Sequence, residues 1–357
     1  MRRIILTCVF ATALAFALPP LLSPPSGSVW AGGSPPASFA VSGVPESPAP
    51  VTSEAPRIAA EPAQTGNPPA PILDDAITLT VLTDDGPAEM RMADYLPLAV
   101  AGEMPADFAP EALKAQAVAL RSYALHYRAE RKSAHPEADV CTSAACCAAC
   151  AGEDALRALW GTRYEENLGK LRQAVAATDG QYLVWEGESV LAVFHACSLG
   201  RTEDGASLGV SAPYLVSVTT PETEERVRRL VTTVELTPLE LRRGVEGLCP
   251  GAQFPEDPAD WLGELKRTDA GRVESLRLGS ETLSGQALRT LFALRSTDFD
   301  LEYRSGMFVF TVRGFGHGLG MSQYGADALA RAGADYREIL AHYYPGTELV
   351  VALVVSD

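Results

Sequence analysis

The chain has 357 residues, of which 45 are acidic and 29 basic, so its formal net charge at pH 7 is −16. A surface this acidic repels nucleic acid and anionic lipid, and no basic run in the sequence offsets it. Nucleic-acid binding is therefore excluded as the main function, whereas the 47% of hydrophobic residues suffice for a folded core.

The N-terminal residues are typical of an export signal. Arg2 and Arg3 precede an apolar run over residues 4–18, and small residues follow it. Because this run is short for a membrane span, residues 1–31 are either a cleaved signal peptide or a retained N-terminal membrane anchor. Both alternatives place the rest of the protein outside the cytoplasm.

Residues 32–75 are rich in Pro, Ala, Ser and Gly, and 14 of the 26 prolines occur by residue 71. Such a composition cannot bury a core, so we predict a disordered linker. The folded part should be one large domain over residues 76–357.

Within this domain, helices and strands are expected to alternate without the regular spacing of a parallel α/β fold. This pattern predicts the α+β class. A helix is indicated from Asp94 to Val100, and a second helix with one apolar face starts at Pro110. Strands are expected at 77–81, 273–278 and 307–312, a hairpin at 181–194, and further helices at 155–178, 283–294, 323–331 and 336–343.

Glu103 lies between these first two helices, in the sequence Ala-Gly-Glu-Met-Pro. A carboxyl group flanked by apolar residues can be desolvated, which raises its pKa and keeps a proton available near neutral pH. The alternative is a glutamate in the first turn of the following helix, stabilised by the helix dipole.

The segment between residues 134 and 152 contains one histidine and four cysteines. They are His135, Cys141, Cys146, Cys147 and Cys150. Imidazole and thiolate groups this close together are a zinc-type ligand set, although the spacing is not that of a standard zinc finger. A loop held by disulfides is the alternative, because export permits them.

Two further segments carry polar side chains at the ends of predicted strands. In the first, His195, Cys197, Ser198 and Thr202 follow the hairpin, and a thiol nucleophile at Cys197 is one interpretation. The second runs from Arg313 to Gly325 and places four glycines at alternating positions around His317. Such a segment lets the backbone approach a ligand closely, or it is simply a turn with a buried histidine.

Taken together, these segments resemble the stage II sporulation protein D family of peptidoglycan lytic transglycosylases and the related amidase-enhancer proteins. The similarity runs from about residue 77 to residue 351. Its densest stretches are residues 94–105, 112–124, 194–203, 284–299 and 314–326.

The resemblance implies particular roles for matching residues. Glu103 would be the catalytic acid/base. His135, Cys141 and either Cys146 or Cys147 would bind zinc in a structural role. Residues that would line the substrate groove or position the acid are His195, Ser198, Thr202, His317, Gln323, Tyr324, Gln116, Arg121 and Tyr123. Leu199 and Cys197 depart from the family's usual glycine and hydroxyl residue.

The resemblance also implies a reaction and a partner. The substrate would be peptidoglycan glycan strands stripped of their stem peptides, cleaved to 1,6-anhydromuramyl products during sporulation engulfment. Since the muramic acid's own hydroxyl is the nucleophile, no cofactor is needed for catalysis. Stripped strands in turn imply an amidase partner. A non-catalytic, glycan-binding amidase enhancer and a zinc-dependent amidase are the alternatives.

Overall fold

The computed structural model describes residues 73–351, so the expected signal or anchor at 1–31 and most of the expected linker lie outside the described part. Within that part, helices and strands intermix and the strands form six small sheets. The α+β class is therefore confirmed. None of the described helices is long and apolar enough to span a bilayer.

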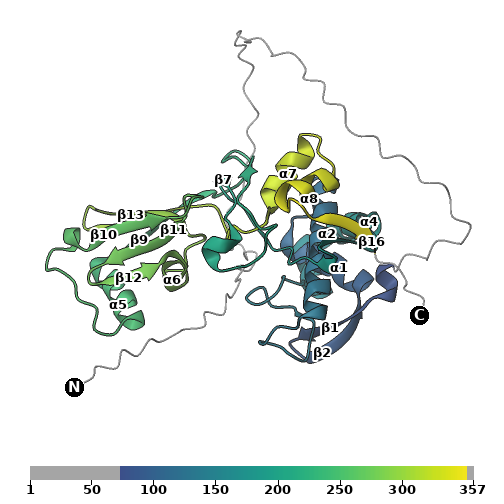
Figure 1. The fold of residues 1–357 in the computed structure, drawn as a ribbon, viewed down its shortest axis with the longest axis horizontal. Helices are drawn as coiled ribbons and strands as arrows, with labels where there is room; N and C mark the ends of the chain where they lie inside the picture. Colours follow the sequence, from purple (N-terminus) through teal and green to yellow (C-terminus); the bar gives the residue numbers. More distant parts are fainter. Residues whose placement is uncertain (1–72, 352–357) are drawn as a thin grey trace, which may run out of the picture. The chain divides into compact units, whose positions relative to one another are not determined.

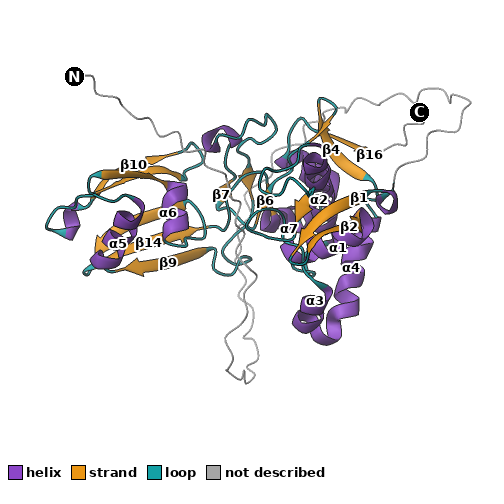
Figure 2. Cartoon of the chain, turned by 90° about the horizontal axis from the view of Figure 1, so that it is seen from below, coloured by secondary structure: helices purple, strands orange, loops and turns teal. Residues whose placement is uncertain are grey.

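The first hydrophobic core is organised around a central helix, α2 (Pro110–Ala129). Proline occupies its first turn, as the sequence predicts. Helix α1 (Met92–Glu103) packs against α2 and runs three residues past the expected end at Val100. Figure 2 shows α1 and α4 beside this helix. Three further helices pack against α2, namely α4 (Tyr164–Ala176), α7 (Gln323–Arg331) and α8 (Tyr336–Tyr343), and α3 (Glu153–Trp160) packs against α4.

Short sheets flank this helical core. Strands β1 (Thr78–Thr83) and β2 (Gly86–Arg91) form a hairpin, and β3 (Val140–Cys141) lies parallel to β1. The hairpin expected at 181–194 ends at Ser189, because Phe194 and His195 pair with a different strand. Its strands are β4 (Gln181–Trp185) and β5 (Glu188–Ser189), with β16 (Glu348–Val351) on the other side of β4. The predicted helix at 155–178 is two helices, separated at Gly161, where φ is +53°.

A second, smaller core involves residues 241–312. Its strands form two antiparallel sheets, in the orders β13-β14-β9 and β10-β11-β12. Two helices, α5 and α6, belong to the same group (Figure 1), and a capping box at Thr237 begins α5. The bounds are β9 (Val231–Leu236), α5 (Pro238–Leu248), β10 (Leu262–Arg267), β11 (Val273–Leu278), β12 (Glu281–Ser284), α6 (Gly285–Leu291), β13 (Asp298–Arg304) and β14 (Met307–Arg313).

The last residues of the expected linker are folded. Asp74 starts a short 3-10 helix (Asp74–Ala76), and its side chain is buried. Both of its carboxylate oxygens accept hydrogen bonds of 2.6 Å from the guanidinium of Arg121. Residues 74 and 75, at the end of the expected linker, therefore belong to the folded part, and Asp74 supplies the counter-ion for a buried arginine.

Candidate active site

Glu103 is the last residue of α1. The helix ends there because Met104 adopts an extended conformation, which the following Pro105 favours. The alternative reading of Glu103 as a first-turn residue of the next helix is therefore wrong. Its side chain is only 7% exposed. A carboxyl group at the negative end of a helix dipole and out of contact with water is held toward its protonated form.

Two segments far away in the sequence meet this carboxyl group. The backbone N–H of Ala149 donates to Oε1 over 2.6 Å, and Nε2 of Gln323 donates to Oε2 over 3.3 Å. Burial raises the pKa of Glu103 to about 7, while these two hydrogen bonds offset part of the rise. The group is therefore balanced between acid and carboxylate near neutral pH.

Gln323 reaches Glu103 because of the glycine-rich segment that precedes it. Gly314, Gly316, Gly318 and Gly320 all have positive φ, a conformation that L side chains rarely adopt. This backbone delivers β15 (Met321–Ser322) alongside β6 (Phe194–His195), in a parallel pair. The next residue, Gln323, then starts α7, with Ser322 as its N-cap.

The parallel pair brings the two polar segments together. His195 lies opposite Ser322, and its ring centroid is 5.8 Å from that of His317. His195 Nδ1 lies 3.1 Å from the carbonyl oxygen of Leu319, so this nitrogen carries the proton. Nε2 then accepts from the Ser198 hydroxyl over 2.7 Å. Burial lowers the pKa of His195 and lowers that of His317 to about 3, so both rings are neutral.

Glu222 connects the segments that contain Ser198 and Ser322, although no sequence pattern indicated a role for this residue. It is 4% exposed and accepts hydrogen bonds from Ser198 N–H at 2.6 Å and from the Ser322 hydroxyl at 2.7 Å. The Thr220 hydroxyl is a third donor. One carboxylate thus joins three loops that border the candidate site.

Similarity to known proteins shows the family of this chain. A sequence model described as stage II sporulation protein matches residues 87–185, which include Glu103 and the cysteine-rich loop. Stage II sporulation protein D of Bacillus amyloliquefaciens is 33% identical over 262 residues, covering 72% of this chain and 74% of that protein. The chain belongs to the stage II sporulation protein D family.

Two further relatives are similar to this chain. The Bacillus subtilis stage II sporulation protein D is 32% identical over 261 residues, with the same coverage of 72% and 74%. The amidase enhancer of Bacillus subtilis is 26% identical over 302 residues, which cover 70% of this chain but 39% of that larger protein. The alignment with the sporulation proteins is thus both closer and more complete.

The family resemblance also suggested Tyr324 and Thr202 for the groove, and these two residues lie in different environments. Tyr324 is partly exposed and packs its ring edge-on against Phe108 at 4.9 Å, close to the Glu-Met-Pro segment. Thr202, by contrast, is buried and accepts from the backbone N–H of Val218 over 2.9 Å. Tyr324 is therefore available to a ligand, whereas Thr202 supports a loop.

The three residues expected to position Glu103 from α2 make no hydrogen bond to it. Arg121 donates to Asp74 and to the carbonyl of Gln181 instead, although it was expected to position Glu103. Tyr123 accepts from Lys132 over 2.8 Å, beside the cysteine-rich loop. Both amide atoms of Gln116 are buried without a partner among the described residues.

The cysteine-rich loop gathers a metal-type ligand set. One ligand atom from each of His135, Cys141, Cys146 and Cys147 lies within 4.8 Å of the others. His135 Nδ1 is 3.1 Å from the carbonyl of Ala138, which leaves Nε2 facing Cys147 Sγ at 3.2 Å. A hydrogen bond that fixes the imidazole in this way is the usual outer-shell feature of a zinc-bound histidine. The four residues therefore fit a tetrahedral zinc site.

The charges around this ligand set also suit zinc. A hydrogen bond with Cys141 and the charge of the nearby Lys132 lower the pKa of Cys147, which favours its thiolate form. Lys132 also donates to the carbonyl of Cys146. Three thiolates and one Zn²⁺ carry a net charge of −1, which this ammonium offsets. Cys150 lies outside the set, and burial raises its pKa to about 12.

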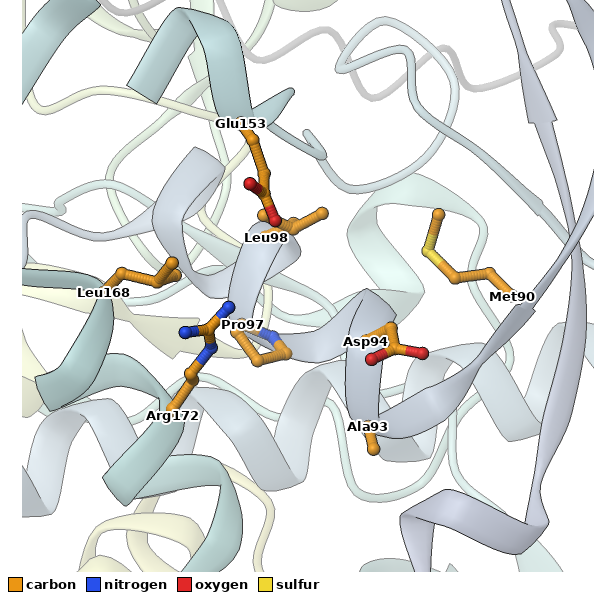
Figure 3. A pocket seen from close by; sticks show the side chains of 8 residues that line it. All are labelled: Met90, Ala93, Asp94, Pro97, Leu98, Glu153, Leu168 and Arg172. Atoms are coloured by element: carbon orange, nitrogen blue, oxygen red, sulfur yellow. The ribbon is translucent and has the colours of Figure 1, made fainter. Parts of the chain in front are cut away.

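A separate cavity of about 280 Å³ lies between α1 and α4 (Figure 3). Asp94 and Arg172 supply opposite charges to its wall, and Pro97, Leu98 and Leu168 supply apolar surface. Glu103 is not among its lining residues. The predicted substrate groove at Glu103 therefore stays a prediction.

Proposed function

We propose that this protein is a lytic transglycosylase that cleaves peptidoglycan glycan strands with Glu103 as its acid/base. The observation that carries the proposal is a single buried carboxyl group whose pKa is raised to about 7. Such a group donates and removes protons with similar ease near neutral pH, which is what general acid/base catalysis by one residue requires. Membership of the stage II sporulation protein D family supports the assignment.

In the first step, protonated Glu103 donates its proton to the glycosidic oxygen as the bond to the muramic acid C1 breaks. The resulting carboxylate then takes the proton of the C6 hydroxyl as that oxygen attacks C1 of the same sugar. The product is a 1,6-anhydro ring, and the proton is back on Glu103. Because the nucleophile belongs to the substrate, its effective concentration is high without a bound water.

Gln323 is suited to follow Glu103 through both protonation states. Its amide carries a donor and an acceptor, and the two are exchanged by a half-turn of the terminal group. With N–H toward Glu103, it stabilises the carboxylate, as the 3.3 Å contact shows. With the carbonyl toward Glu103, it accepts from the carboxylic acid.

A hydrolase with two catalytic carboxylates fits less well. Such enzymes keep a second carboxylate free to act on water or on the anomeric carbon. Glu222 is a buried carboxylate near His195 and Ser322, but its oxygens already accept from Ser198, Ser322 and Thr220. The one-carboxyl mechanism needs no such group.

The metal site also fits a structural role better than a catalytic one. Four protein ligands complete a tetrahedron, whereas catalytic zinc keeps one position for water or substrate. Zinc bound by His135, Cys141, Cys146 and Cys147 would fix the loop that ends at Ala149, whose N–H meets Glu103. This argues against a zinc-dependent amidase.

A second candidate function is that of a non-catalytic amidase enhancer. The 26% identity to a protein of that name favours it. A protein that only binds glycan has no need of a desolvated glutamate, so the state of Glu103 favours the enzyme. We further propose that the protein acts outside the cytoplasmic membrane during sporulation, on strands that an amidase partner has stripped of stem peptides.

The decisive experiment is mass spectrometry of amidase-treated sacculi after incubation with the protein. We expect 1,6-anhydromuramyl products, and a loss of roughly 10²- to 10⁴-fold in rate for Glu103→Gln. Glu89→Gln, an exposed glutamate on β2, is the matched control and should cleave normally. Binding without anhydro products would instead establish the enhancer.

A further inference from the structure

Arg272, directly before β11, is a buried arginine with unused hydrogen-bond donors. This residue is only 3% exposed. Its Nη2 donates to the Ser198 hydroxyl over 2.7 Å. Nε and Nη1 are also buried, but neither has a hydrogen-bond partner among the described residues. Leaving donors of a charged group unmet in the interior is costly, so such groups are normally paired.

The neighbouring carboxylates do not serve as that partner. Both oxygens of Glu203 are occupied, by Asp204 N–H at 2.9 Å and by the Thr268 hydroxyl at 2.8 Å. Asp298 faces Arg313 at 3.4 Å, and Glu222 binds the loop donors described above. Across residues 73–351, no carboxylate forms an ion pair with Arg272.

Burial lowers the pKa of the Arg272 guanidinium, whereas the nearby charges of Asp298, Glu203 and Glu222 raise it. Arg289, on α6, is close enough that its charge lowers the pKa of His317, as does that of Arg272. Gly318 lies against the guanidinium so closely that a Cβ there would collide with it. Arg289 and His317 are each 7% exposed, so this cluster reaches the surface at its edge. The cluster thus offers an anion two N–H donors in a site with little water.

The cluster is also connected to the candidate acid/base. The Ser198 hydroxyl contacts both Arg272 and His195. His195 pairs with Ser322, and the next residue, Gln323, hydrogen-bonds to Glu103. This series of contacts links Arg272 to the candidate acid/base.

We propose that Arg272 recognises a carboxylate, namely the free lactyl carboxylate of muramic acid in a strand without stem peptides. This inference rests on the proposed function and names the feature that selects the substrate. In intact peptidoglycan the lactyl carbonyl is an amide, which is neutral. Hydrolysis of that amide leaves one anionic carboxylate on each muramic acid. A planar guanidinium with two free N–H groups matches the two oxygens of a carboxylate.

The test compares two forms of the same amidase-digested glycan strands. One keeps the lactyl carboxylates, and in the other they are converted to neutral methylamides. We expect the wild-type protein to cleave the acid form with a kcat/KM roughly 10- to 100-fold higher, the range of one charge-assisted hydrogen-bond pair. Arg272→Gln should lose that preference, so that its kcat/KM values on the two strand forms become equal.

Two further variants complete the design. Arg272→Lys keeps the charge but not the fork, so part of the preference should remain. Arg304→Gln removes an exposed arginine that pairs with Glu302, and it should behave like the wild-type protein. If Arg272→Gln fails to fold, the Lys variant and the wild-type comparison still decide.

Equal cleavage of both strand forms by the wild-type protein would overturn the inference, as would a preference that Arg272→Gln leaves intact. Failure of the proposed function looks different, because neither form would then yield anhydromuramyl products.

Discussion

The backbone N–H of Ala149 donates to Oε1 of Glu103 over 2.6 Å. Ala149 lies two residues beyond Cys147, so the candidate metal loop and the candidate acid/base share one hydrogen bond. The same contact requires glycine before Glu103, because a Cβ on residue 102 would meet the Ala149 carbonyl oxygen at 2.6 Å.

Gly102→Ala should destabilise the protein and lower its activity. The added methyl group forces the loop away from Glu103, and an overpacked contact of this kind costs about 1–3 kcal/mol. Thermal unfolding of the variant measures the cost. Gly152→Ala is the control, since nothing lies within 4 Å of its added Cβ and the variant should unfold like the wild-type protein. Equal melting temperatures for both variants would contradict the packing described here.

Activity should depend on pH through Glu103. Its pKa of about 7 means that the proton donor is lost as the pH rises through that value, so kcat/KM should fall above it. Gln323→Leu removes a donor that stabilises the carboxylate, so the pKa should rise further and the fall should move to higher pH. We expect the rate to drop by up to about tenfold, the cost of one hydrogen bond. A pH–rate profile unchanged by this substitution would argue against the contact.

The raised pKa of Glu103 should also make the stability of the protein depend on pH. A folded-state pKa raised above the ordinary value of 4.5 means that folding takes up a proton between these two values. The free energy of unfolding of the wild-type protein should therefore fall as the pH rises from 4.5 to about 7. Glu103→Gln removes this dependence, so the variant should gain stability relative to the wild-type protein, by at most roughly 3 kcal/mol above pH 7. Denaturant unfolding at pH 4.5 and pH 8 is the measurement.

Metal removal should loosen the cysteine-rich loop. We expect one zinc per chain, and chelation should lower the melting temperature and speed hydrogen exchange at the Ala149 amide. Cys141→Ser should reproduce both effects, because it removes one ligand of the set. Cys150→Ser should retain the metal, since that thiol lies outside the set. A protein that contains no zinc when purified without chelator, and is indifferent to chelation, would favour the disulfide alternative.

The start of the domain should be sensitive to Asp74. Asp74→Ala leaves Arg121 buried without its counter-ion, and breaking a buried pair typically costs about 3–5 kcal/mol. Asp75→Ala, next to it, loses only an exposed contact with Arg91 and should cost less than about 1 kcal/mol. Unfolding curves of the two variants test this. Similar losses in both would show that the buried pair is not what holds this end of the chain.

Much of the secondary structure could be predicted because it depends on local pattern. The apolar stripe of α2 and the proline in its first turn determine that helix before any tertiary contact forms. The failures occur where the tertiary structure changes what the local pattern favours. Residues 190–195 continue a strand-like sequence, yet Phe194 and His195 pair with β15, because the glycine-rich segment delivers that strand alongside them.

The sequence alone determined the fold class, the family and Glu103 as the residue to examine, since these depend on composition, periodicity and motifs. It also pointed to the four residues that could hold a metal ion, because they lie within one short loop. Only the tertiary structure decided what surrounds Glu103, that Arg121 belongs with Asp74, and that Arg272 has donors without partners. Burial and hydrogen bonding between distant segments set these properties, and neither is encoded in the spacing of neighbouring residues.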